Sequence, residues 1–129
     1  MILDSNHLQL MQLEKWVRDF ASQCKLSDRT TFNLELVLAE AVTNVMDYAG
    51  QPEGKIEVSC TLRPESIVVE IIDEGLPFDP TVNTVTFPQT LEDARPGGLG
   101  IHLMRHKASE MHYHRENNRN ILCMSLPIQ

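Results

Sequence analysis

The sequence has few of the features that mark secreted or membrane-spanning proteins. Its three cysteines, Cys24, Cys60 and Cys123, are widely spaced and odd in number. They therefore suggest neither a disulfide framework nor a metal site, and reduced thiols are typical of the cytosol. No apolar run approaches the roughly 20 residues that cross a bilayer, and the N-terminus lacks a basic-then-apolar signal pattern. We expect a cytoplasmic protein with no membrane partner.

Positive charge is also scarce, because 11 Lys and Arg stand against 18 Asp and Glu, for a net charge of −7. Binding to a nucleic-acid backbone needs clustered basic side chains, so the charge argues against duplex nucleic acid, and we expect no direct nucleic-acid partner. Any polyanion bound here must be small and held by backbone amides and a metal. The length of 129 residues and the 42% hydrophobic content predict a single domain over residues 1–129 with a real core.

A long helix is predicted to begin after a cap at Ser27 or Asp28 and to run to about Tyr48. Its apolar stripe is spaced for a helix and consists of Leu34, Val37, Leu38, Ala41, Val45 and Tyr48. Glu40 and Asn44 lie four residues apart and share one face beside this stripe.

Asp47 is expected on the side of that helix that carries Asn44, one turn further on. A carboxylate and a carboxamide in a nearly apolar helix need partners, since unpaired burial of polar groups is costly. A hydrated divalent cation with phosphate oxygens would suit both. Taken alone, however, the stretch is also consistent with an ordinary amphipathic helix whose polar residues face water.

The remaining periodic segments predict an α+β chain. An amphipathic helix is expected from a cap at Ser5 or Asn6 to about Cys24. Alternation and β-branched residues predict strands at residues 55–62, 67–72, 111–115 and 121–126. His112 and His114 share one face of a strand and are interpreted as surface residues, because further metal ligands are missing.

Two glycine-containing segments are candidate ligand sites. After the second strand come Asp73, Gly75, Pro77 and Phe78, an arrangement that fits either an acid reading a ligand's hydrogen-bond donor or a simple acidic turn. Residues 81–96 have no period, which favours a lid or binding loop. The next segment, Gly97-Gly98-Leu99-Gly100, leads into an apolar helix over residues 99–108, where helix N-terminal amides could bind phosphate; a flexible hinge is the alternative.

The ordered set of these motifs resembles the GHKL, or Bergerat, ATP-binding domain of gyrase, histidine kinases and their relatives. The resemblance is carried by residues 36–49 (LVLAEAVTNVMDYA), 71–80 (IIDEGLPFDP) and 96–104 (PGGLGIHLM). The chain is most similar to the small RsbW/SpoIIAB-type anti-sigma-factor serine/threonine kinases. The implied fold is a two-layer α/β sandwich of the α+β class, with a mixed, mostly antiparallel sheet and about three helices on one face.

The resemblance also implies roles for individual residues, with ATP and Mg²⁺ as cofactors. Asn44 matches the magnesium ligand, Glu40 the residue that orients or deprotonates the attacking hydroxyl, and Asp73 the acceptor for the adenine amino group. Arg95 is placed where a lid cation reaches the terminal phosphate. The full implied cofactor-binding set is Asn44, Asp47, Asp73, Gly75, Pro77, Phe78, Arg95, Gly97, Gly98, Leu99 and Gly100.

The implied function is an ATP-dependent serine/threonine protein kinase and anti-sigma-type regulator. Its substrate would be a STAS-domain anti-anti-sigma protein in a partner-switching pathway, with a sigma factor as a further partner. Two alternatives stay open: a non-catalytic ATP-binding interaction module, and the catalytic domain of a histidine kinase. The sequence departs from the family in having Tyr48 where a histidine is usual. Only residues 2–4 remain for the N-terminal strand that often forms a dimer edge, so a homodimer is left open.

Overall fold

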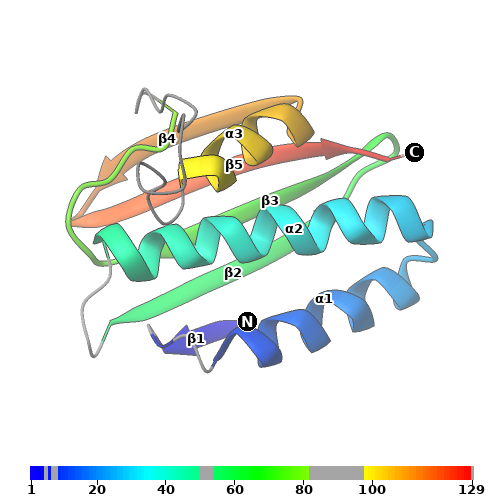
Figure 1. The fold of residues 1–129 in the computed structure, drawn as a ribbon, viewed down its shortest axis with the longest axis horizontal. Coiled ribbons are helices and arrows are strands. Elements are labelled where there is room, and N and C mark those ends of the chain that lie inside the picture. The colour runs from blue at the N-terminus through cyan, green and yellow to red at the C-terminus, as the bar shows by residue number, and fades with distance from the viewer. Residues whose placement is uncertain (5, 7–8, 50–53, 82–97, 129) are drawn as a thin grey trace.

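The computed structural model describes residues 1–4, 6, 9–49, 54–81 and 98–128, which form two layers. One layer is a five-stranded sheet in the order β1-β2-β3-β5-β4, and the helices α1, α2 and α3 cover one of its faces (Figure 1). This confirms the predicted α+β sandwich. The sheet was expected to be mixed, whereas each of the neighbouring strand pairs in the described part of the chain is antiparallel.

The strands agree closely with the alternation in the sequence. Their bounds are Ile2–Asp4 (β1), Lys55–Leu62 (β2), Ser66–Asp73 (β3), Glu110–Glu116 (β4) and Arg119–Pro127 (β5). The short N-terminal strand is present and pairs with β2. Asn117 and Asn118 join β4 to β5 with φ angles of 53° and 62°, which asparagine tolerates and a two-residue type I′ hairpin turn requires.

Helix α1, Leu10–Gln23, begins later than the sequence suggested. Its N-cap is Gln9, which makes no side-chain capping bond, so the predicted cap at Ser5 or Asn6 is wrong. The Asn6 carbonyl instead accepts a 2.9 Å bond from the Gln9 amide, because the chain must first turn away from β1. Ser5 lies outside the described residues. The helix ends before Cys24, as predicted.

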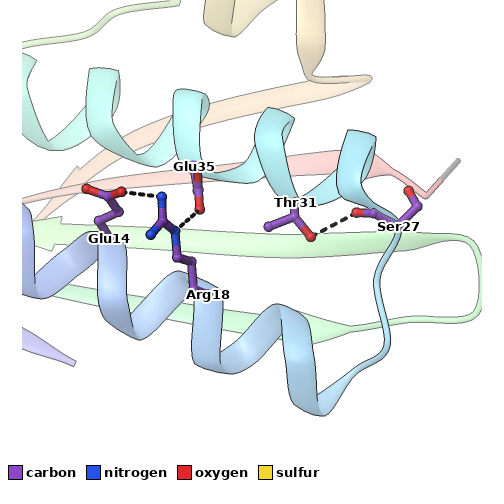
Figure 2. Close-up of polar contacts among 5 residues, drawn as sticks. All are labelled: Glu14, Arg18, Ser27, Thr31 and Glu35. Atoms are coloured by element: carbon purple, nitrogen blue, oxygen red, sulfur yellow. Dashed lines mark hydrogen bonds and ion pairs between the residues drawn. The ribbon is translucent and has the colours of Figure 1, made fainter.

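Helix α2, Asp28–Asn44, packs its apolar stripe against the sheet. Ser27 is the N-cap, and its side chain accepts a 3.1 Å bond from the Thr30 amide, which confirms the predicted cap. The outer side of α2 is tied to α1 by an ion pair (Figure 2): Arg18 Nε lies 3.0 Å from Glu35 Oε1, and its guanidinium also pairs with Glu14 at 2.6 Å.

The α-helical geometry stops at Asn44, where the sequence predicted that it would continue to Tyr48. The next residues form a π-helical turn, η2, Val45–Ala49. A π turn closes with i→i+5 bonds and takes more residues per turn than an α-helix. Asp47 therefore falls out of phase with Asn44 and is exposed, so the expectation that both share one side of a continuous α-helix is corrected.

The core lies between α2 and the sheet. Its fully buried side chains include Leu34, Val37, Leu38, Val42, Val58, Ile67, Ile71, Met104 and Met124. Met104 comes from α3, Gly98–Lys107, which begins within a residue of the predicted start. None of the helices in the described ranges has the length and apolarity needed to cross a membrane.

Candidate nucleotide-binding site

A pocket opens where the C-terminal end of α2 meets the end of β3, the start of β5 and α3. Its cavity volume is about 20 Å³, and the pocket is partly open to solvent. Its walls are mostly apolar, with Asn44, Asp73, Tyr113 and Asn120 as polar groups. The complete lining is Ala41, Asn44, Val45, Ile71, Asp73, Phe78, Pro80, Met104, Tyr113, Asn120 and Leu122. A largely apolar pocket with a few convergent polar groups is typical of a cofactor site.

Asn44 is the most unusual group in this pocket. The residue is 2% exposed, and neither Oδ1 nor Nδ2 has a hydrogen-bond partner among the described residues. Leaving a buried polar group unsatisfied costs about 1–3 kcal/mol. The arrangement is therefore understandable if a ligand supplies the missing partner, and a carboxamide oxygen is a suitable ligand for a hard divalent cation.

Glu40 lies one helical turn before Asn44 and is half-buried, so it stands beside the pocket and is not part of its lining. Burial, and secondarily the negative charge of Asp47, raise the pKa of the Glu40 carboxyl above its usual value of 4.5. A carboxyl whose pKa is raised toward neutrality is a better proton acceptor for a hydroxyl nucleophile. Asp47 thus acts on Glu40 by its charge, although it lies outside the pocket lining.

Asp73 lines the same pocket from the end of β3 and is 4% exposed. Its Oδ1 accepts a 2.8 Å bond from the Gly75 amide and a 3.0 Å bond from Asn120 Nδ2. The turn after β3 is therefore held by the carboxylate itself. Asn44 and Asp73 both line the pocket, as their predicted roles toward one ligand require.

Three residues of the site were missed by sequence reasoning: Asn120, Tyr113 and Arg115. Asn120 Oδ1 accepts from Tyr113 Oη at 2.5 Å and from Arg115 Nη1 at 3.0 Å. The only local signal was a polar residue preceding the apolar run of β5. Its importance comes from the pairing of β3 with β5, which places Asn120 opposite Asp73.

Some of the other predicted site residues are described by the structure, and the rest lie outside the described residues. Phe78 lines the pocket, Pro77 is exposed, and Gly75 is buried. The backbone of Gly98, Leu99 and Gly100 forms the first turn of α3, while Arg95, Gly97 and nearly all of the expected lid lie outside the described residues. The segment leading toward the lid is tied to α3, because Arg105 Nη2 donates a 2.5 Å bond to the Pro80 carbonyl.

The described residues contain no group of three or more His, Cys, Asp or Glu side chains able to hold a metal ion alone. A cation bound at Asn44 would therefore need oxygen ligands from elsewhere, and nucleotide phosphates would supply them. His112 and His114 are exposed on β4 and lie 3.6 Å from Glu110 and Glu116, respectively. The prediction that they are surface residues is confirmed.

Comparison with known proteins agrees with this geometry. A family model described as the histidine kinase-like ATPase domain matches residues 3–126. The chain belongs to this family. Membership in the histidine kinase-like ATPase family confirms the resemblance drawn from the three motifs and implies the use of ATP.

Two curated relatives are protein kinases. The serine/threonine-protein kinase BtrW of Bordetella bronchiseptica is 32% identical over 113 residues, which cover 85% of this chain and 80% of BtrW. The serine-protein kinase RsbW of Halalkalibacterium halodurans is 27% identical over 77 residues. That match covers 56% of this chain and 48% of RsbW, so the chain spans about half of that relative. These relatives confirm the predicted enzyme class, a serine/threonine protein kinase of the histidine kinase-like ATPase family.

Solved structures of histidine kinases share the fold. The catalytic domain of the histidine kinase ThkA has a TM-score of 0.57 at 14% identity, with 99% of this chain and 96% of that one covered. The histidine kinase domain from the Erythrobacter litoralis EL346 blue-light activated kinase has a TM-score of 0.54 at 18% identity. The alignment covers 77% of this chain and 45% of that structure. At these identities the likeness concerns the fold alone.

Proposed function

We propose that the protein is a kinase that transfers the terminal phosphoryl group of Mg²⁺-ATP to a serine or threonine of a STAS-domain anti-anti-sigma protein. In this proposal a sigma factor is a second partner in a partner-switching pathway, and the protein works in the cytoplasm. The observation that supports it best is the buried Asn44 carboxamide, which has no hydrogen-bond partner among the described residues and lines the same pocket as Asp73.

The residues present fit magnesium-ATP. Asn44 would hold the metal through its carboxamide oxygen, Asp73 would accept a hydrogen bond from the adenine amino group, and the backbone amides at the start of α3 would face phosphate. The metal would supply charge neutralisation at the phosphates when bound. The pocket walls at Phe78 and Met104 offer apolar surface to a flat base.

Glu40 is proposed as the general base for the protein substrate. Phosphoryl transfer depends mainly on positioning and charge stabilisation, so one base beside the phosphate site is sufficient. Because Glu40 is half-buried and stands outside the pocket lining, a hydroxyl of a second protein can approach it from solvent. Its raised pKa adjusts it for accepting the hydroxyl proton.

The proposal is tested by incubating the protein with purified STAS-domain proteins and γ-labelled ATP. We expect label on one STAS protein, and we expect Glu40→Gln to reduce the rate by at least about 100-fold, the range for a general base. Glu35→Gln is the matched control on the same helix, since Glu35 faces Arg18 away from the pocket; it should keep the wild-type rate.

Absence of label transfer to every STAS protein, together with an ATP-dependent pull-down of one of them, would instead support a non-catalytic ATP-binding module. Equal rates for Glu40→Gln and Glu35→Gln would remove Glu40 from the mechanism.

A further inference from the structure

The carboxylate of Asp73 is held on one side only. Both of its hydrogen bonds, from the Gly75 amide and from Asn120 Nδ2, go to Oδ1. The described residues give Oδ2 no hydrogen bond. One oxygen of the carboxylate is thus committed to the protein, while the other is left as an acceptor at the pocket wall, where Asp73 is a lining residue.

Asn120 is itself fixed at both ends of its carboxamide. Nδ2 donates to Asp73 Oδ1 and, at 2.8 Å, to the Leu76 carbonyl. Oδ1 accepts from Tyr113 Oη and from Arg115 Nη1. Two donors on Oδ1 and two acceptors on Nδ2 allow only one orientation of the amide, so its N–H groups must point at Asp73 and at the turn.

Arg115 closes the network from the edge strand. Its Nη1 also donates a 2.9 Å bond to the Gly75 carbonyl, and Gly75 is the residue whose amide binds Asp73. The turn that follows β3 is therefore held through Gly75 and Leu76 by side chains from β4 and β5, and Asn120 is 4% exposed. Asp73 and Asn120 at the centre of this network are buried, whereas Tyr113 is half-buried and Arg115 is exposed. The rigidity expected of a satisfied polar network therefore applies best to the buried Asp73–Asn120 pair.

We propose that Asn120, supported by Tyr113 and Arg115, is the positioning residue that sets base specificity, because it holds Asp73 so that Oδ2 selects a purine with an amino group at position 6. This inference rests on the proposed binding of ATP at this pocket. An exocyclic amine donates to Oδ2, whereas a 6-oxo purine presents a second acceptor and is repelled. Discrimination therefore depends on how firmly Asn120 prevents rotation of the carboxylate.

The test compares the dissociation constants of Mg²⁺-ATP and Mg²⁺-ITP, measured by calorimetry on the full chain, because inosine differs from adenosine at this position. Wild type should prefer ATP by on the order of 100-fold, since a site built to bond an NH group rejects an analogue lacking it. Asn120→Ala should reduce the preference to about tenfold or less. Tyr113→Phe, which leaves the Arg115 bond in place, should reduce it about threefold.

Leu126→Ala is the matched control for lost stability. Leu126 is buried in the same strand as Asn120, outside the pocket lining. Leu126→Ala should lower the melting temperature yet keep the wild-type ATP-to-ITP ratio. If Asn120 had a purely structural role, Asn120→Ala would give the same result. If Asn120→Ala does not fold, Tyr113→Phe decides the question alone.

The outcomes separate this inference from the proposed function. An unchanged ATP-to-ITP ratio in both Asn120→Ala and Tyr113→Phe overturns the role of Asn120, while binding of ATP stands. Failure of wild type to bind either nucleotide overturns both. A third outcome is a wild-type protein that prefers ATP over ITP but has no kinase activity, with variants that lose the preference. This result removes the kinase proposal and leaves the specificity role of Asn120.

Discussion

Asn44 and Asn120 line the same pocket and are buried to nearly the same degree, at 2% and 4% exposure. Their carboxamides are nevertheless opposite cases. The Asn120 side chain takes part in four hydrogen bonds with the protein, whereas Asn44 makes none with the described residues. Buried polar atoms are almost always paired in native structures, so the difference separates a residue that builds the pocket from one that is available to a ligand.

The largest effect is expected when the paired asparagine is removed. Asn120→Leu leaves the Leu76 carbonyl and the Tyr113 hydroxyl without their partner and takes one of two donors from Asp73. We expect the free energy of unfolding to fall by about 3 kcal/mol, as for the loss of a buried network. Urea denaturation without nucleotide measures it, and a loss below about 1 kcal/mol would show that the network adds little.

The same substitution at the unpaired asparagine should behave differently. Asn44→Leu removes a buried polar group that has no partner in the described part of the chain, so the unliganded protein should keep its stability or gain about 1 kcal/mol. The rise in melting temperature produced by Mg²⁺-ATP through mass action should disappear. Thermal scans with and without nucleotide test both parts. A marked destabilisation of the unliganded protein would mean that Asn44 is already paired, and the comparison would fail.

The smallest effect on the free energy of unfolding is expected from the Glu40 carboxyl, one helical turn before Asn44. Because the pKa of Glu40 is raised in the folded protein, the neutral carboxyl favours folding. That contribution is complete below about pH 4.5 and is lost as pH rises through the folded-state pKa. Glu40→Gln should therefore be slightly more stable than wild type at pH 8, by roughly a few tenths of a kcal/mol given solvent screening, and equal to it near pH 4.

Urea denaturation at the two pH values measures this difference. Asp47→Asn is the companion variant, because Asp47 is the secondary cause of the raised pKa; it should reduce the pH-dependent gap between wild type and Glu40→Gln. A Glu40→Gln protein that is less stable than wild type at pH 8 would reverse the sign of the argument.

Much of the fold was predictable because its signals are local. The alternation of Lys55–Leu62 fixed the bounds of β2, and the stripe through Leu34, Val37 and Leu38 identified the face of α2 that packs on the sheet. Ser27 was recognisable as a cap from its side chain. The start of α1 was not, because a turn after β1 competed with the capping residues.

The site was predictable only where its residues carry a motif. Asn44 and Asp73 could be found because each stands at the end of a periodic segment, and the structure places both in one pocket. Asn120 could not, since its contact with Asp73 arises from pairing between β3 and β5, which are not consecutive in the chain. The roles of Arg95 and Gly97 stay predictions, because both lie outside the described residues.

The π-helical turn at Val45–Ala49 has one further consequence. Such a turn corresponds to a single residue inserted into an α-helix. The residues before it keep their alignment with the sheet, so the insertion is absorbed without repacking the layer that α2 shares with β3. Removing one residue from this turn would thus restore the α-helical register after Asn44 while leaving the Asn44 side chain where it is.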